Sequence, residues 1–295
     1  MQSDKLKNYL HLHLLVFIAG FTAILGELIS IDAIPLVWYR MTIAGLLMFF
    51  FIKLKKRSLK VPLKAFIRFS IAGIIIALHW ITFFAAIKAS NISITLAMFS
   101  TGAFFASLIE PLFYKRKIIG YEIIFGCIVI VGVVLITQTE LQYLLGIALG
   151  ISSALFSTLF AVLNGKFVKN YKASVISFYE FVSGVLFISI FIAFTGDGFE
   201  ASYFQISKTD WLCLFILASI CTAYAFIASI HVMKQITPYT LVLTYNLEPI
   251  YGIVLAVILF PETETMQPLF YLGAGLIIST VLLNAVFKNM NKSKI

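Results

Sequence analysis

The feature that most constrains this fold is a series of long apolar segments joined by short loops. Each segment is about the 17–25 residues that an α-helix needs to cross the hydrocarbon core of a bilayer. Ten segments can be placed, near 10–29, 33–52, 67–87, 92–113, 119–136, 144–163, 173–194, 211–230, 236–260 and 269–287. Only 12% of the 295 residues are charged, against about 25% in soluble domains. We therefore predict an all-α polytopic membrane protein with ten transmembrane helices.

The basic residues predict how these helices are oriented. When the loops are assigned alternately to the two sides of the membrane, one side receives 19 of the 22 Lys and Arg residues. The other side receives only Lys88 and Lys208, and Arg40 lies within a span. Basic residues collect on the cytoplasmic side of membrane proteins. Both termini are thus predicted to be cytoplasmic, in the cytoplasmic membrane, and the net charge of +9 does not indicate a nucleic-acid partner.

Nothing in the sequence indicates an enzyme, a metal or a cofactor. The three cysteines all lie in apolar segments, where packing is a more natural role than a disulfide. The triplet at 165–167 (GKF) lacks the upstream glycine spacing of a phosphate-binding loop. An integral-membrane enzyme would show clustered nucleophiles or metal ligands, and the histidines of the interior stand alone. We therefore expect no cofactor, no metal and no enzymatic activity.

The two halves of the chain resemble each other. A shift of 147 residues places GCIVIVGVVLI (126–136) on GAGLIISTVLL (273–283) and the fourth segment on the ninth. Each half holds five segments, so the second half must enter the membrane in the opposite sense. Inverted repeats of this kind recur in secondary transporters, with the substrate site near the midplane. We predict two inverted five-helix repeats, residues 1–139 and 140–295.

Two long stretches, 77–112 and 221–262, resemble the two repeats of EamA-type transporters of the drug/metabolite transporter superfamily. The motifs 246–249 (NLEP) and 260–262 (FPE) match the second repeat, whereas the first repeat has Glu110 later in its helix and Lys115 where Glu262 would align. The resemblance implies a ten-helix secondary transporter with a central cavity lined mainly by spans one to four and six to nine. Export is the expectation for this family, and the resemblance does not imply a substrate.

The ninth segment carries the most unusual groups, because Asn246, Glu248 and Pro249 lie near its middle. A carboxylate at this depth costs roughly 2.5–3.5 kcal/mol, and a proline removes one backbone hydrogen bond. Helical spacing places four polar side chains on one face, namely Thr240, Thr244, Glu248 and Tyr251. This face either lines a cavity or forms a polar seam against a neighbouring helix.

Arg40, Glu27 and Glu180 are further charged residues within predicted spans. Arg40 and Glu27 lie at similar depths near the outer side and could form an ion pair. Arg40 could instead extend to the lipid headgroups, or face the cavity and bind a substrate carboxylate in bidentate fashion. Glu180 lies in the inner third of the seventh span. It either pairs with a lysine of the loop at 166–172 or serves as a proton site.

His79 and Trp80 lie in the outer half of the third span. An imidazole there could relay protons or bind a carboxylate, or it could be a neutral side chain bonded to a neighbouring hydroxyl. The candidate cavity residues are Glu27, Arg40, His79, Trp80, Thr101, Glu180, Tyr224, Thr244, Asn246 and Glu248.

These carboxylates, hydroxyls, amide and aromatic rings suit amino acids, their derivatives or small amphipathic cations. We predict a secondary transporter, in the exporting direction, that moves small polar metabolites by alternating access. A proton or another ion is the candidate coupling partner, with Glu248 and Glu180 as its sites, and a passive channel or facilitator is the alternative. The fifth and tenth segments carry glycines and lack polar interior residues, so we expect them to pack closely or to form a homodimer.

Overall fold

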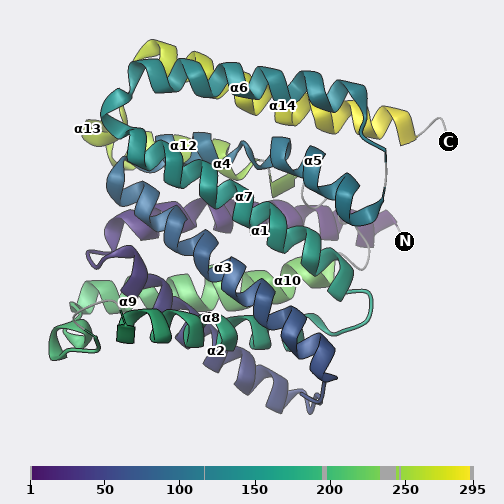
Figure 1. The fold of residues 1–295 in the computed structure, drawn as a ribbon, viewed down its shortest axis with the longest axis vertical. Coiled ribbons are helices and arrows are strands. Elements are labelled where there is room, and N and C mark those ends of the chain that lie inside the picture. The colour runs from purple at the N-terminus through teal and green to yellow at the C-terminus, as the bar shows by residue number, and fades with distance from the viewer. Residues whose placement is uncertain (1, 116, 195–197, 233–243, 246, 293–295) are drawn as a thin grey trace.

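In the computed structural model every regular element of the described residues is helical, and those residues are 2–115, 117–194, 198–232, 244–245 and 247–292 (Figure 1). The elements are α1 (Gln2–Leu28), α2 (Ala33–Leu54), α3 (Leu63–Ala89), α4 (Ile92–Phe99), α5 (Gly102–Tyr114), α6 (Gly120–Thr139), the 3₁₀ turn η1 (Leu141–Tyr143), α7 (Leu144–Phe167), α8 (Ala173–Phe194), the 3₁₀ turn η2 (Ala201–Phe204), α9 (Lys208–Ala218), the π-helical turn η3 (Ser219–Tyr224), α10 (Ala225–Val232), α12 (Glu248–Leu259), α13 (Pro261–Glu264) and α14 (Pro268–Lys292).

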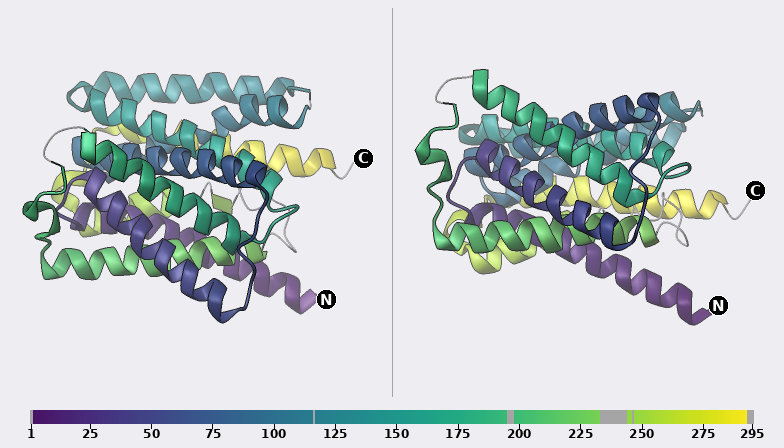
Figure 2. Two further views of the ribbon diagram at one scale, coloured as in Figure 1. Left: turned by 60° about the horizontal axis from the view of Figure 1, so that its bottom comes forward. Right: turned by 90° about the horizontal axis from the view of Figure 1, so that it is seen from below.

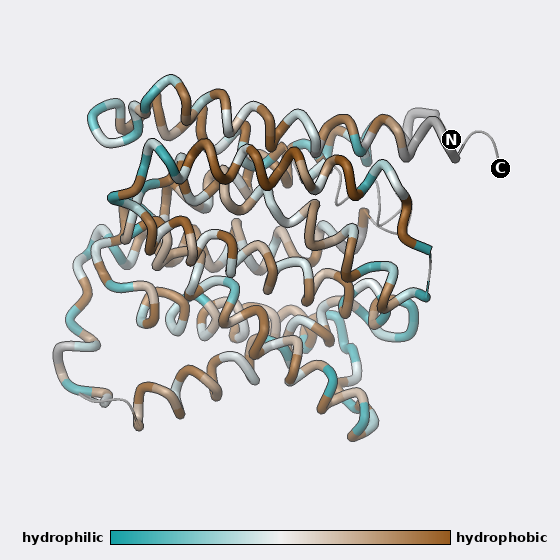
Figure 3. The backbone as a smooth tube through the Cα atoms, turned by 45° about the horizontal axis from the view of Figure 1, so that its top comes forward, coloured by the Kyte–Doolittle hydropathy of each residue, from teal (hydrophilic) through white to brown (hydrophobic). Residues whose placement is uncertain are grey.

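Within the described residues, eight helices are long and apolar enough to cross a membrane. They are Lys7–Leu28, Ala33–Leu54, Leu63–Ala89, Ile92–Tyr114, Gly120–Thr139, Leu141–Phe167, Ala173–Phe194 and Lys208–Ser229. Most hydrophobic residues lie along the bodies of these helices, and hydrophilic residues are more frequent at their ends and in the loops, as the colours of the backbone show (Figure 3). Two shorter apolar helices, Glu248–Leu259 and Pro268–Asn284, occupy the last two predicted segments. Part of the ninth segment, namely 236–243 and 246, lies outside the described residues, so the count of ten stays a prediction.

Two pairs of helices that correspond by the repeat lie side by side and run in opposite directions. Tyr121, near the start of α6, lies 5.7 Å from Phe287 near the end of α14, measured between ring centroids. At the other end of this pair, a Cβ built on Gly273 would meet the Ile136 side chain at 2.8 Å. Figure 1 shows α6 and α14 along one edge of the bundle. An inverted repeat requires this antiparallel arrangement.

The pair α2 and α8 is arranged in the same way. Trp38, near the start of α2, donates from Nε1 to Ser189 Oγ near the end of α8 at 2.9 Å. Phe49, near the end of α2, lies 5.9 Å from Phe178 near the start of α8. The start of α1 and the end of α14 lie at the same end of the bundle (Figures 1 and 2). That arrangement agrees with the prediction that both termini share one side of the membrane.

The close packing predicted for the fifth and tenth spans is confirmed. A Cβ on Gly132 of α6 would lie 2.8 Å from the Gly273 carbonyl oxygen, and a Cβ on Gly273 would lie 2.7 Å from the Gly132 carbonyl oxygen. Only glycine allows two helix backbones to approach this closely. A homodimer through the outer faces of these helices stays a prediction. All three cysteines are free, as expected.

The fourth span is interrupted at its middle, where α4 ends at Phe99 and α5 begins at Gly102. The amides of Thr101 and Phe104 donate to carbonyls three residues back, at 3.0 and 2.9 Å. The repeat shift of 147 residues places Thr101 on Glu248, where α12 begins with Pro249 in its first turn. A proline is well tolerated there. Both repeats therefore start a helix at the same depth, and only one uses a proline to do so.

Two buried carboxylates join the repeats at the end of the bundle opposite the termini. Glu264 accepts the amides of Ile92 and Ser93, at 2.9 and 2.8 Å. Asp210 accepts both the amide and the hydroxyl of Ser30, each at 2.7 Å. Hydrogen bonds to a charged group contribute about 1.5–3 kcal/mol each. The closing carboxylate of the second repeat is thus Glu264, which is buried, rather than the exposed Glu262 of the sequence motif.

Candidate functional site

Arg40 lies buried where α2, α3 and η3 meet, with 3% of its surface exposed. Its Nε donates to Thr222 Oγ1 at 2.8 Å, and its Cζ lies 3.9 Å from the centroid of the Trp80 ring. The Phe84 ring lies farther along, at 5.5 Å. Its Nη1 is buried without a hydrogen-bond partner in the described structure. A guanidinium that stacks on a ring and donates one hydrogen bond from Nε keeps N–H groups available for an anion.

The predicted ion pair of Arg40 with Glu27 is not formed. The polar side chain that Arg40 contacts is Thr222, and Glu27 is half-buried near the end of α1. The cation beside that helix end is Lys88, whose Nζ donates to the Ile29 carbonyl at 2.6 Å. The burial of Arg40 among helices also disfavours an extension to the lipid headgroups. The geometry favours the remaining alternative, in which Arg40 faces an interior site.

Thr222 reaches Arg40 because the eighth span contains a π-helical turn. Thr222 Oγ1 accepts from Arg40 and itself donates to the Leu217 carbonyl five residues back, at 2.7 Å. Both capacities of the hydroxyl are therefore used. Single π-helical turns occur frequently at functional sites. The matching helix α3 runs without such a turn from Leu63 to Ala89, and the sequence offered no signal for this difference between the repeats.

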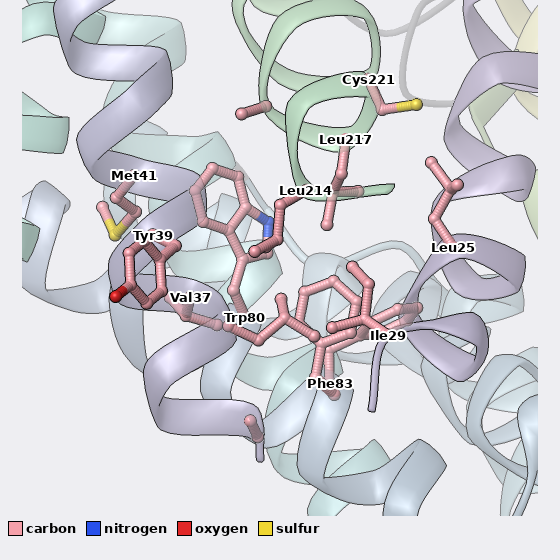
Figure 4. Close-up of a cluster of buried hydrophobic side chains, with 14 of the residues drawn as sticks. Leu25, Ile29, Val37, Tyr39, Met41, Trp80, Phe83, Leu214, Leu217 and Cys221 are labelled. Carbon is pink, nitrogen blue, oxygen red and sulfur yellow. The ribbon is translucent and has the colours of Figure 1, made fainter. Parts of the chain in front are cut away.

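Trp80 supports the guanidinium from the hydrophobic core. It lies in a cluster with residues of α1, α2, α3 and α9, among them Val37, Phe83 and Leu214 (Figure 4). The stacked face of an aromatic ring attracts a cation, and the attraction is strongest away from water. Trp80 therefore places an apolar, cation-binding wall beneath Arg40.

Glu248 is the carboxylate that interacts with Arg40 across the interior. It is half-buried at the first position of α12, and no ion pair joins it to Arg40 among the described contacts. Gly20 of α1 lets the start of α12 approach, because a Cβ there would lie 3.2 Å from the Glu248 carbonyl oxygen and 3.1 Å from the Gly252 amide nitrogen. A cation and a carboxylate thus lie close enough to attract each other while remaining unpaired.

His79 is bound to the neighbouring repeat. Its Nδ1 lies 2.9 Å from Ser153 Oγ and 3.1 Å from the Ser153 carbonyl oxygen. Ser153 Oγ in turn donates to the His79 carbonyl at 3.2 Å. The ring stacks on Phe99 at 5.5 Å. This geometry favours the alternative in which His79 is bonded to a hydroxyl and joins α3 to α7.

Glu180 is a fully buried carboxyl group without a hydrogen-bond partner. Neither of its oxygens has one in the described structure, and nor does Asn164 Oδ1, although the Asn164 side chain lies beside Glu180. The pairing of Glu180 with a lysine of the loop at 166–172 is therefore wrong. Three acceptor oxygens without a donor are costly in a protein interior, so this cluster calls for a proton or a cation.

The other candidates are not brought together in this way. Thr101 is buried, and its hydroxyl donates to the Met98 carbonyl at 2.7 Å. Tyr224 is 42% exposed, and its hydroxyl lies 2.7 Å from His11 Nε2, away from the Arg40 cluster. Thr244 is half-buried, and Asn246 lies outside the described residues. The residues that sequence reasoning missed are Thr222 and Phe84 beside Arg40, and Asn164 beside Glu180.

Comparisons with known proteins agree with this architecture. The sequence model of the EamA-like transporter family matches residues 6–138 and again residues 144–286. One solved crystal structure aligns with a TM-score of 0.65 and covers 94% of this chain and 97% of its own, at 13% sequence identity. A likeness at that identity concerns the fold alone. No curated protein matches the sequence significantly.

Proposed function

Because this chain belongs to the EamA-like transporter family, we propose that it exports small polar metabolites across the cytoplasmic membrane by alternating access. The chain is a multi-pass membrane transporter of the drug/metabolite transporter superfamily. The two repeats, 1–139 and 140–295, would rock against each other around a central site, as inverted-repeat transporters do. The hydrogen bonds that Asp210 and Glu264 make between the repeats would break when the transporter opens to the outside and form again when it closes.

The Arg40 cluster is the observation that carries this proposal. Arg40 is anchored by Thr222 and Trp80, yet one of its nitrogens has no hydrogen-bond partner. Glu248 supplies the opposite charge without pairing. A zwitterion would place its carboxylate on Arg40 and its ammonium group toward Glu248, so that each buried charge of the protein meets an opposite charge. Amino acids and their derivatives are therefore the proposed substrates.

Glu180 supports a coupling proton at a second site. In the described structure the oxygens of Glu180 and Asn164 have no hydrogen-bond partner, although the two side chains lie beside each other. A proton on Glu180 would supply a donor and remove the charge from a site that is closed to solvent. The site belongs to α7 and α8, whereas the Arg40 cluster belongs to α2, α3, η3 and α12. Proton binding and substrate binding would thus be linked through the movement of the repeats.

Flux into proteoliposomes tests the proposed function. We expect saturable uptake or exchange of one class of amino acid in a panel that also contains monocarboxylates and amphipathic cations. An imposed pH gradient should change the rate. Flux that rises linearly with concentration would establish the channel alternative, and chemical change of the compound would establish an enzyme.

The proposed orientation predicts where cysteines can be labelled. On a background in which Cys127, Cys213 and Cys221 are replaced by alanine, a cysteine in the loop at 198–207 should react with a membrane-impermeant reagent in intact cells. A cysteine at 54–60 should react only after the cells are opened, because basic loops stay in the cytoplasm. The reverse pattern would overturn the orientation.

A further inference from the structure

We propose that a hollow at the connection between α2 and α3 binds the headgroup of an anionic phospholipid. The hollow measures about 710 Å³, and its lining includes Lys53, Arg57, Ser58, Lys60 and Tyr179. Three of these side chains are cationic, and none of the described residues around the hollow is acidic. It lies at the end of the bundle that holds the termini. The transport proposal makes no use of it.

The end of α2 shapes this hollow through a left-handed turn. Lys56 has φ of +47°, a conformation that costs a residue with a Cβ. The amide of Lys56 donates to the Lys53 carbonyl and the amide of Arg57 to the Ile52 carbonyl, both at 3.0 Å. These two bonds satisfy the last carbonyls of the helix. The turn also sends Arg57 back over the Phe51 ring, with Cζ 5.2 Å from its centroid.

Residues of α8 hold the loop in this shape. Tyr179 donates from its hydroxyl to the Leu59 carbonyl at 2.6 Å. Arg57 donates from Nη1 to Ser174 Oγ at 2.9 Å. Ser174 is a neutral partner, so the positive charge of Arg57 is not compensated by this bond. The hollow is therefore built by two segments far apart in the sequence, and its cationic lining is in place before any ligand arrives.

The surroundings of the hollow favour a lipid over a free phosphate. The adjoining turns of α2 and α3 expose large apolar side chains, with Leu54 at 81%, Leu63 at 72% and Phe50 at 59%. In a bilayer these side chains would lie beside acyl chains, directly below the cationic lining. Basic pockets at the cytoplasmic ends of spans attract anionic headgroups. A free phosphate would share the contacts with the lysines and gain nothing from the apolar strip.

Native mass spectrometry of the purified full-length protein tests the proposal, with phosphatidylglycerol, phosphatidylcholine and inorganic phosphate as probes. We expect phosphatidylglycerol to be retained and phosphatidylcholine to be lost. The double variant Lys53→Gln/Lys60→Gln should weaken retention about 30-fold, since each basic residue near an anionic surface contributes about fivefold. Both lysines are exposed, so folding should be unaffected, and circular dichroism checks this.

The double variant Lys166→Gln/Lys169→Gln is the matched control. These lysines lie over Phe113 and Tyr114, outside the hollow, so their replacement should leave retention unchanged. An equal loss in both double variants would show attraction by general surface charge and overturn the site. Displacement of the lipid by inorganic phosphate at low millimolar concentration would overturn the lipid as its occupant. Equal retention of phosphatidylglycerol and phosphatidylcholine would overturn both the cationic site and the anionic lipid as its ligand.

Discussion

Replacement of Arg40 by methionine is expected to abolish transport while leaving the folded protein at least as stable. Arg40 is buried, stacked on Trp80 and bonded to Thr222, with Nη1 unpartnered. Arg40 forms no ion pair among the described contacts, so methionine removes the desolvation cost of a buried charge and loses one hydrogen bond. Loss of a bidentate contact to a substrate carboxylate should lower flux at least about 100-fold. Proteoliposome flux and thermal unfolding in detergent measure the two effects.

Two further variants serve as controls for the Arg40→Met variant. Arg68→Met makes the same change on the exposed side of α3 and should leave both flux and unfolding temperature near those of the wild type. Arg40→Lys keeps the charge but loses the planar fork and the stacking, so it should restore little activity. A strongly destabilised Arg40→Met protein would show that Arg40 is a structural group. A fully active one would remove it from the substrate site.

The variants Glu248→Gln and Glu180→Gln are expected to damage different properties of transport. Glu248→Gln should lower the flux of zwitterions about tenfold or more, because a hydrogen bond to a charged group is worth about 1.5–3 kcal/mol. Monocarboxylates without an ammonium group should be unaffected. Glu180→Gln keeps a donor permanently beside Asn164, so exchange should persist and its dependence on an imposed pH gradient should disappear. Proteoliposome flux of zwitterions and monocarboxylates, measured with and without a pH gradient, distinguishes the two variants.

The two glutamine variants also serve as controls for each other. Both replace a carboxylate in a span by an amide of the same shape, so a general cost of the substitution would affect both alike. Unchanged zwitterion flux in Glu248→Gln would exclude its role in binding. Undiminished pH dependence in Glu180→Gln would exclude Glu180 as the coupling site. Loss of the Glu248→Gln protein from the membrane would favour the polar-seam alternative for Glu248, and loss of the Glu180→Gln protein would show that Glu180 is a structural group.

The spans were predictable because bilayer thickness constrains helix length. The seventh segment, predicted at 173–194, is α8 (Ala173–Phe194), and the second, predicted at 33–52, is α2 (Ala33–Leu54). The break in the fourth span was not predictable in the same way. No proline occurs at Thr101–Gly102, although α4 ends at Phe99 and α5 begins at Gly102. Local sequence carries little information about such a break.

The sequence predicted how deep each charged residue of the site lies in the membrane, and it did not predict which neighbours its side chain faces. Hydropathy places Arg40 and Glu27 at similar depths, and an ion pair followed from depth alone. The rotation of each helix and the π-helical turn η3 instead bring Thr222 to Arg40. For Glu180 the sequence left two alternatives, a proton site or a pair with a lysine of the loop at 166–172, which precedes it in the chain. Its side chain points into the interior, where Asn164 lies beside it.

Sequence alone determined the membrane class, the order of the spans and the depth of each charge. The free-energy cost of placing polar groups in hydrocarbon acts on every residue separately, so it can be read without neighbours. Tertiary structure alone decided which of those charges meet, because contacts between helices depend on rotation, local breaks and glycine approaches spread over the whole chain. Three features of this kind are the close approach of Gly20 to α12, the π-helical turn η3 and the stacking of Arg40 on Trp80.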